Sequence, residues 1–232
     1  MKDISTIPWK SVYQSLDDKG YTLLPSLLSN EECDHLSDQY PKSELYRSTI
    51  NMERYRFGKG EYKYFTYPLP ALLQNIRTSL YPGLAILGND WMARLGIDTK
   101  FPLTQEELIN ECHIKGQIRP TPLILRYEAT GFNTLHQDLY GDVYFPFQVV
   151  IVLNEVHQDY EGGEFILIEQ IPRAQSRAEV ISPHKGDALI FTTNFRPMKG
   201  TRGYYRAKMK HGISPLKSGI RFALGVIFHD AK

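Results

Sequence analysis

The chain lacks the features of a small secreted fold and of a membrane protein. Its 232 residues include only two cysteines, Cys33 and Cys112, in unrelated contexts, which favours reduced thiols over a disulfide framework. No run of about 18 apolar residues is present, and the start of the chain, Met1 to Thr6, has no apolar signal core. We therefore expect a cytoplasmic protein with no membrane segment.

An excess of charge of one sign is also lacking. The chain has 27 lysines and arginines against 26 acids, a net charge of +1. Whole-chain basicity therefore gives no argument for a polyanionic partner, and any nucleic-acid site must be local. An apolar content of 42% and a charged content of 23% are ordinary for a globular protein of one domain, and exclude disordered, collagen-like and membrane classes.

The first half of the chain has mainly helical periodicity. Helix starts are marked by Ser29 and Thr104, each followed three residues later by glutamate, and Gly20 marks a helix end. We expect helices over 8–20, from 29 towards 40, over 70–96 and from 104 to about 116. A strand is expected at 21–24 and a hairpin around Gly58-Lys59-Gly60. The inward stripe of the third helix includes Ile86 and is interrupted at Pro82-Gly83.

The second half has short apolar runs separated by Gly, Pro and Asn. Strands are expected at 123–127, 148–153, 164–168, 188–192 and 220–228. Because βαβ alternation is missing, this pattern indicates a β-barrel or jelly roll. We predict an α+β protein in which residues 1–116 form a helical and hairpin elaboration packed on a core of residues 117–232, in one folded unit.

A metal site is suggested within the run from Leu123 to Tyr144. If this run is a strand, His136 and Asp138 share one face, about 7 Å apart along the chain. With a second imidazole from a partner strand they would form the facial triad of non-haem Fe(II) oxygenases, which leaves coordination positions open. His211 is the best candidate for that imidazole.

Arg221 is a polar residue at the start of an otherwise apolar strand. We expect a turn at Lys217-Ser218-Gly219 that joins this strand to the segment of His211 as a hairpin. A buried guanidinium needs an anionic partner, and the hairpin offers no carboxylate. A bound dicarboxylate would serve, because arginine binds carboxylates in a bidentate way. The alternative is an ion pair with a carboxylate such as Glu164.

These four residues, in this order, resemble the Fe(II)- and 2-oxoglutarate-dependent dioxygenases. Tyr127 stands where relatives often place a tyrosine on the far carboxylate of 2-oxoglutarate. More narrowly, the chain is similar to an uncharacterised group of prolyl-hydroxylase-like dioxygenases predicted to modify nucleic acids. The stretches that carry this similarity are Arg119-Pro120-Thr121-Pro122, His136-Gln137-Asp138-Leu139-Tyr140-Gly141, Gly162-Gly163-Glu164-Phe165, Gln175-Ser176-Arg177-Ala178-Glu179 and Phe228-His229-Asp230-Ala231.

The resemblance implies a double-stranded β-helix core behind supporting N-terminal helices. It implies that His136, Asp138 and His211 hold Fe(II), that Arg221 and Tyr127 bind 2-oxoglutarate, and that O2 takes the remaining position, with ascorbate as reductant in vitro. The enzyme would hydroxylate or oxidatively demethylate its substrate, and a nucleic acid is the first candidate. Two alternatives stay open: a hydroxylase of protein or peptide side chains, and a sensor that binds 2-oxoglutarate and metal without turnover.

A second His-x-Asp sequence, His157-Gln158-Asp159, competes for the metal. It lies among polar turn-forming residues, and we assign it to a surface loop.

Candidate substrate-binding residues are Gln137, Tyr140, Arg119 and Arg202. The chain also has two basic and aromatic stretches, one from Arg54 to Phe65 and one from Phe195 to Lys210. Such stretches track phosphates and stack bases in single-strand-binding proteins. The alternative, solvated strand faces and aromatic edges of the core, has equal weight at this point.

Overall fold

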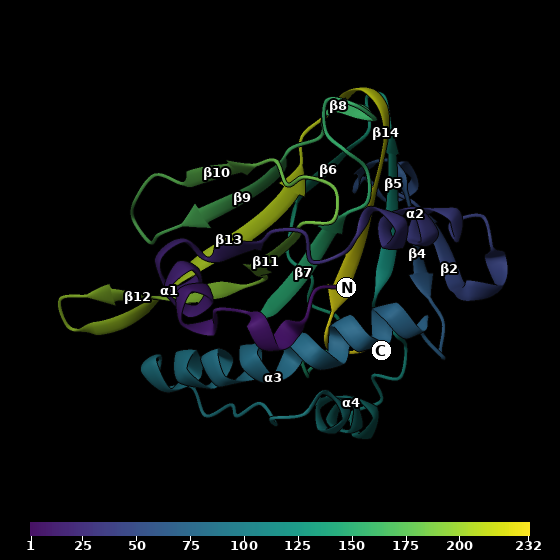
Figure 1. The fold of residues 1–232 in the computed structure, drawn as a ribbon. Helices are drawn as coiled ribbons and strands as arrows, with labels where there is room; N and C mark the ends of the chain where they lie inside the picture. The colour runs from purple at the N-terminus through teal and green to yellow at the C-terminus, as the bar shows by residue number, and fades with distance from the viewer.

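Two antiparallel sheets packed face to face form the centre of the molecule (Figure 1). The structure is a computed structural model that describes residues 1–232. The larger sheet has the order β1 (Tyr21–Leu24), β11 (Ala188–Thr192), β7 (Phe147–Val152), β14 (Leu216–Ile227), β5 (Leu123–Glu128), β4 (Glu61–Phe65) and β2 (Tyr46–Asn51), and β8 (Tyr160–Gly162) pairs with β14. The smaller sheet has the order β10 (Arg177–Ile181), β9 (Phe165–Gln170), β13 (Gly203–Ile213), β6 (Phe132–His136) and β3 (Gly58–Lys59), and β12 (Phe195–Gly200) pairs with β13. The predicted double-stranded β-helix is confirmed.

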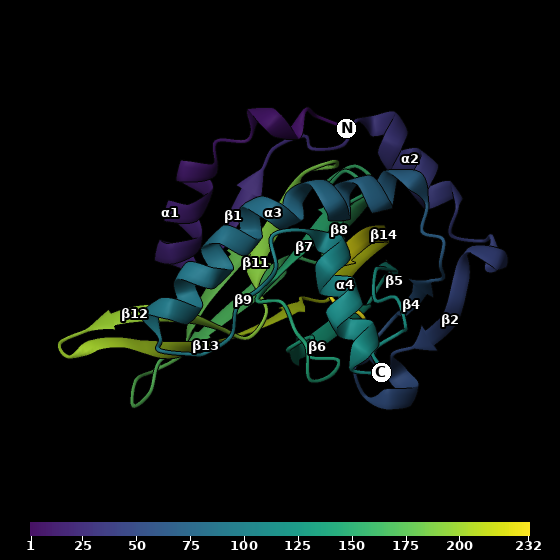
Figure 2. The ribbon, with the colours of Figure 1, turned by 90° about the horizontal axis from the view of Figure 1, so that it is seen from below.

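Four α-helices and three short 3-10 helices support the sheets. The helices are η1 (Ile4–Thr6), α1 (Trp9–Lys19), α2 (Asn30–Asp38), η2 (Ser43–Leu45), η3 (Glu53–Tyr55), α3 (Ala71–Arg94) and α4 (Gln105–Ile114). Ser29 and Thr104 form the capping boxes expected of them, and Gly20 ends α1 in the left-handed conformation. Figure 2 shows α3 running along the sheets from below, with α4 beside it.

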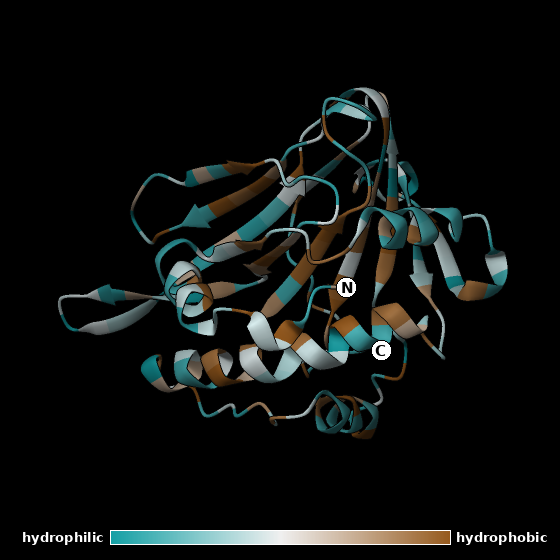
Figure 3. Ribbon diagram, in the orientation of Figure 1, coloured by the Kyte–Doolittle hydropathy of each residue, from teal (hydrophilic) through white to brown (hydrophobic).

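Strand β7 separates two hydrophobic cores. Val149 and Ile151 belong to the larger core, which also contains the inward face of α3. Val150 and Val152 belong to the smaller core, between the two sheets. Because β7 is buried on both faces, its sequence is a nearly continuous apolar run rather than an alternating one. Figure 3 shows the hydrophobic residues gathered on these central strands, whereas the β12–β13 hairpin is mostly hydrophilic.

The N-terminal half contributes strands to both sheets as well as helices. β1 pairs with β11, β4 with β5 and β3 with β6. The larger core likewise joins Leu73 of α3 to Leu224 of β14. Residues 1–116 and 117–232 therefore share one hydrophobic core. The boundary between residues 116 and 117 stays a prediction.

The helix α3 is continuous through Pro82-Gly83, so the predicted interruption is wrong. Pro82 is exposed, while Tyr81 and Leu84 on either side of it are fully buried and hold the helix against the sheet. Gly83 has a packing role, because a Cβ there would lie 2.4 Å from the indole of Trp9 in α1. The assignment of Ile86 to the inward stripe is also wrong, since its side chain is 55% exposed.

Two predicted hairpins differ from the structure. The chain turns at Ser214-Pro215, and β13 and β14 lie in different sheets, so Lys217-Ser218-Gly219 is not a turn but part of β14. There it pairs with β8 around an irregularity in register. Near Gly58, the hairpin is formed by β2 and β4, while Gly58–Lys59 forms β3 and crosses to the smaller sheet to pair with β6. Both errors concern which strand pairs with which, and the local sequence does not determine this.

A buried ion pair ties α3 to the end of the chain. Arg77 is 1% exposed and its Nη2 lies 2.9 Å from Oδ1 of Asp230, which is fully buried. The same guanidinium donates to the carbonyls of Ile227 and Phe228 and to the hydroxyl of Tyr67. Ile227, Phe228 and Asp230 lie at the end of β14 or just after it, so Arg77 fixes the end of that strand against α3.

We expect Arg77→Ala to lower the free energy of unfolding by about 3–5 kcal/mol, because it removes the buried cation that pairs with the Asp230 carboxylate and leaves only Tyr67 and His113 in contact with it. Urea denaturation measures this. The control is Asp142→Ala, which removes an exposed pair with Lys232 and should leave the urea midpoint nearly unchanged. Equal midpoints for the two variants would contradict this role of Arg77.

His229 should make stability depend on pH. Its ring is buried, its Nδ1 accepts the N–H of Phe145 at 3.2 Å, and burial, with the nearby charge of Arg77, lowers its pKa to about 4. Between the ordinary pKa of about 6.5 and pH 4 the unfolded chain binds this proton and the folded chain does not, so stability falls as pH falls. We expect the wild type to lose about 3 kcal/mol more than His229→Asn over this range. Equal pH profiles of unfolding would contradict the assignment.

Candidate active site

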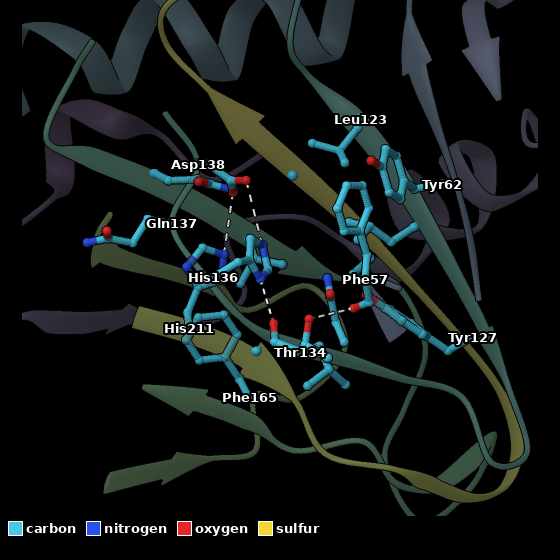
Figure 4. A pocket seen from close by; sticks show the side chains of 18 of the residues that line it. Phe57, Tyr62, Leu123, Tyr127, Thr134, His136, Gln137, Asp138, Phe165 and His211 are labelled. Carbon is cyan, nitrogen blue, oxygen red and sulfur yellow. Dashed lines mark hydrogen bonds and ion pairs between the residues drawn. The ribbon is translucent and has the colours of Figure 1, made fainter. Parts of the chain in front are cut away.

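A cavity of about 230 Å³ lies between the two sheets (Figure 4). Its walls come from both sheets: β4, β5, β7, β11 and β14 of the larger one, and β6, β9 and β13 of the smaller one. The lining is mostly apolar, with a few polar groups that include the predicted metal ligands and Arg221. Such a cavity is typical of a small-molecule site.

His136, Asp138 and His211 meet at one end of this cavity. His136 is the last residue of β6 and is paired in register with His211 of β13, so the ring centroids lie 4.2 Å apart. Asp138 presents Oδ1 at 3.6 Å from Nε2 of His136 and Oδ2 at 3.4 Å from Nε2 of His211. The three potential ligand atoms lie within 4.8 Å of one another. Two imidazoles and one carboxylate are the donor set of a facial triad.

The strand geometry behind this cluster differs from our expectation. The run from Leu123 to Tyr144 is not one strand, because β5 and β6 are separated by a turn and β6 ends at His136. Asp138 therefore lies in the loop after the strand. Its Oδ1 accepts a hydrogen bond from the hydroxyl of Tyr140 at 2.7 Å, and Tyr64 donates to that hydroxyl at 3.2 Å. The carboxylate is thus oriented by Tyr140 of its own loop, which Tyr64 of β4 supports in turn, and not by strand alternation.

The pKa shifts of Asp138 and His211 favour the forms that bind metal. Burial disfavours the charged carboxylate of Asp138, but the hydrogen bond and charge of His211, the charge of His136 and the Tyr140 hydroxyl outweigh it and hold the Asp138 pKa well below its usual range. Burial, and then the nearby His136, lower the pKa of His211. Nδ1 of His136 lies 2.7 Å from the carbonyl of Thr134, which leaves Nε2 as the acceptor facing the cavity. A carboxylate and neutral imidazoles are the forms that bind metal.

Arg221 lies in the same cavity without a hydrogen-bond or ion-pair partner, and its guanidinium contacts only the rings of Tyr127 and Tyr160, at 6.0 and 5.8 Å from their centroids. It is 1% exposed, and its Nε, Nη1 and Nη2 have no hydrogen-bond partner. Glu164, the alternative partner, is hydrogen-bonded to Ser214 instead. Tyr127 is paired with Arg221 across β5 and β14, and its buried hydroxyl is unpartnered too. A buried, unpaired charge is costly, so this end of the cavity is suited to an anion.

The residues present therefore fit the two groups that such a site would take. The triad offers two nitrogen ligands and one oxygen ligand with open positions, as Fe(II) requires. The free guanidinium and phenol offer donors to a carboxylate, as 2-oxoglutarate requires. Gly163 supports this arrangement, because a Cβ there would lie 3.1 Å from Cδ of Arg221.

Two of the four predicted substrate residues line the cavity and two lie outside it. Tyr140 and Gln137 line the cavity, although the Gln137 amide already donates to the carbonyls of Asn194 and Met209 and points away from the triad in Figure 4. Arg119 and Arg202 do not line it. Arg119 is exposed near the C-terminus and Arg202 is exposed at the tip of the β12–β13 hairpin. Substrate binding by these four residues stays a prediction.

The competing sequence His157-Gln158-Asp159 forms an exposed turn, as expected. His157 pairs with Glu161 at 3.0 Å, and no cluster of potential metal ligands includes it.

Gln148 is a cavity residue that the sequence analysis missed. It is 5% exposed, faces the cavity from β7, and its Oε1 has no hydrogen-bond partner. The available signal was its position as the one polar residue in the apolar strand Phe147–Val152. Tyr62 and Tyr64 also line the cavity, although the sequence analysis noted them only as part of a basic and aromatic stretch.

Fold and site together define an Fe(II)- and 2-oxoglutarate-dependent oxygenase. Residues 60–231 match the Oxygenase-NA family, described as "Oxygenase, catalysing oxidative methylation of damaged DNA", and the chain belongs to this family. The resemblance stated from the sequence is thus confirmed, and the chain is an oxidoreductase. None of the helices combines the length and the apolar composition that a membrane-spanning helix needs.

Relatives of this chain include two Mycobacterium tuberculosis proteins, the uncharacterized proteins Rv2227 of strain H37Rv and MT2286 of strain CDC 1551. Each is 43% identical over 167 residues, which is 72% of this chain and 72% of the relative. Among solved structures, a Burkholderia pseudomallei oxidoreductase of the 2OG-Fe(II) oxygenase family superposes with a TM-score of 0.58 at 14% identity, covering 97% of this chain and 94% of the other. A Pseudomonas putida prolyl-4-hydroxylase superposes with a TM-score of 0.55 at 13% identity, covering 97% and 99%. These two likenesses show the fold.

We expect His136→Ala and Asp138→Ala each to weaken Fe(II) binding more than 100-fold, because each removes a ligand, whereas the loss of a mere supporting residue costs 10- to 100-fold. Anaerobic titration calorimetry measures the affinity. His157→Ala is the matched control and should bind as the wild type does. Loss of metal in His157→Ala with normal binding in His136→Ala would overturn the assignment.

Proposed function

We propose that this oxygenase hydroxylates or oxidatively demethylates a nucleic-acid substrate, with His136, Asp138 and His211 holding Fe(II) and Arg221 binding 2-oxoglutarate. The observation that carries the cosubstrate assignment is the buried, unpaired guanidinium of Arg221 in the same cavity as the triad. A charge that is buried without a partner in the free protein gains its partner when the dicarboxylate binds.

Each end of the cavity has a separate task. Arg221 and Tyr127 bind the far carboxylate and so direct the keto end of the molecule towards the triad. Leu125, Val150 and Ala223 line the cavity and exclude water from it. When bound, iron and 2-oxoglutarate supply the oxidation of a C–H bond by O2, with release of succinate and carbon dioxide.

The assignment of a nucleic-acid substrate has two supports. The family to which the chain belongs is described as acting on damaged DNA. In addition, the basic and aromatic stretch from Arg54 to Phe65 contributes Phe57, Tyr62 and Tyr64 to the cavity. On a methylated base, hydroxylation of the methyl group would lead to demethylation.

The test is succinate formation from 2-oxoglutarate by the purified protein with Fe(II), ascorbate and O2, comparing wild type with His136→Ala. Methylated and unmodified DNA and RNA, and peptides, are added in turn. Stimulation by a nucleic acid that falls steeply with salt supports the proposal. Stimulation by a peptide alone would make the enzyme a side-chain hydroxylase, and absence of turnover with iron bound would make the protein a sensor.

We expect Arg221→Met to keep Fe(II) binding but to weaken 2-oxoglutarate binding about 10- to 100-fold, since charge-assisted hydrogen bonds contribute about 1.5–3 kcal/mol. Binding of 2-oxoglutarate to the protein loaded with Mn(II) under nitrogen measures this. Arg173→Met, which replaces an exposed arginine, is the control. Unchanged 2-oxoglutarate affinity in Arg221→Met would refute the cosubstrate role.

A further inference from the structure

Two aromatic side chains stand half-exposed at the mouth of the cavity. Phe57 lines the cavity and is 46% exposed, and Tyr55 beside it is 50% exposed. Their rings are stacked, with centroids 5.6 Å apart and planes 20° apart. The guanidinium of Arg54 lies 5.9 Å from the centroid of Tyr55. We call this pair, Tyr55 and Phe57, the aromatic platform.

The aromatic platform is fixed relative to the triad. The carbonyl of Phe57 accepts hydrogen bonds from the N–H and the hydroxyl of Thr134, at 2.8 and 2.9 Å, and Thr134 lies two residues before His136 on β6. The amides of Tyr55 and Phe57 both donate to the carbonyl of Met52, whose side chain is fully buried. The rings are therefore preorganised, and an occupant of the platform lies at a defined distance from the reacting centre.

The surroundings of the platform indicate a flat and anionic occupant. Arg54, Arg56 and Lys59 are exposed in the same segment, against a single acid, Glu53. Exposed aromatic rings among cations are the arrangement that stacks bases and tracks phosphates in proteins that bind single strands. A proline-rich peptide would use the rings but would leave the cations without partners.

The other basic stretch points away from this mouth. On β13, Arg206 and Lys208 alternate with the buried Ala207, Met209 and His211, so their side chains lie on the face opposite the triad. The hairpin of β12 and β13 also projects from the body of the molecule (Figure 1). A nucleic-acid strand whose target base lies at the triad would therefore contact the aromatic platform and not the basic side chains of β13.

We propose that the aromatic platform stacks the base next to the target base of a single-stranded segment, while the target base alone enters the cavity. This rests on the proposed function. Asp138 and His211 lie buried inside the cavity between the two sheets, so a target base must leave its pair and its stack to reach them.

The test is fluorescence anisotropy of a labelled 12-nucleotide single-stranded DNA with the full chain, Mn(II) and 2-oxoglutarate under nitrogen. Tyr55→Ala and Phe57→Ala should each raise Kd about 5- to 100-fold. The substitutions Tyr55→Phe and Phe57→Tyr should keep the wild-type Kd, because either ring stacks. The matched control is Tyr204→Ala, which removes a 41% exposed tyrosine from β13 and should change Kd less than twofold. Thermal melting of every variant excludes loss of folding as the cause.

A scan of single abasic sites along the strand makes the test specific. At one position, removal of the base should weaken binding by the wild type but not further weaken binding by Phe57→Ala, as a double-mutant cycle requires for two groups in contact. If the loss of affinity from base removal and the loss from Phe57→Ala add at every position, no base contacts Phe57 and the platform is wrong. A larger loss in Tyr204→Ala than in the platform variants would do so as well.

Failure of the platform and failure of the proposed function are distinguishable. If the alanine variants bind the strand normally while the strand still stimulates succinate formation by the wild type, the platform is wrong and the nucleic-acid oxygenase stands. If a proline-rich peptide binds and stimulates in place of the strand, both the platform and the nucleic-acid substrate are wrong, and only the oxygenase remains.

Discussion

The pairing of β6 with β13 is the constraint on which the site depends. It sets His136 directly opposite His211 and brings the two imidazoles together before any metal is considered. Because side chains alternate along a strand, a slip of one residue in this pairing would turn one imidazole out of the cavity. The register is held on both sides, since β13 also pairs with β9 and β6 also pairs with β3.

The site retains polar groups that the free protein leaves unsatisfied. Arg221, Tyr127 and Gln148 are all buried and all have atoms without partners in the same cavity. Such groups destabilise a fold, and they persist here between two hydrophobic cores that hold the surrounding strands in place. Elsewhere the protein satisfies its buried charges, as the pair of Arg77 and Asp230 shows. Six of the eight buried side-chain atoms without a hydrogen-bond partner belong to residues that line this cavity, which is a physical mark of a binding site.

The two halves of the chain supply different parts of the site. The triad and Arg221 all lie after residue 117, whereas Phe57, Tyr62 and Tyr64 of the cavity wall come from the N-terminal half. Tyr64 links the two halves, because it donates to Tyr140 and through it supports Asp138. We infer that the C-terminal half carries the chemistry common to these oxygenases, and that the N-terminal half determines what enters the cavity.

The sequence by itself determined the local elements and the residues of the triad. Helix caps such as Ser29 and Thr104, the apolar strands, and the order of His136, Asp138, His211 and Arg221 are readable because they depend on neighbouring residues or on a family pattern. Only the tertiary structure decided which strands pair. It placed β13 and β14 in different sheets and Gly58–Lys59 in the smaller sheet. It also brought Phe57 and Gln148 into the lining of the cavity. It also placed Arg119 and Arg202 outside the cavity. The reason is that partner choice is set by burial and packing between segments far apart in the chain, which local periodicity does not contain.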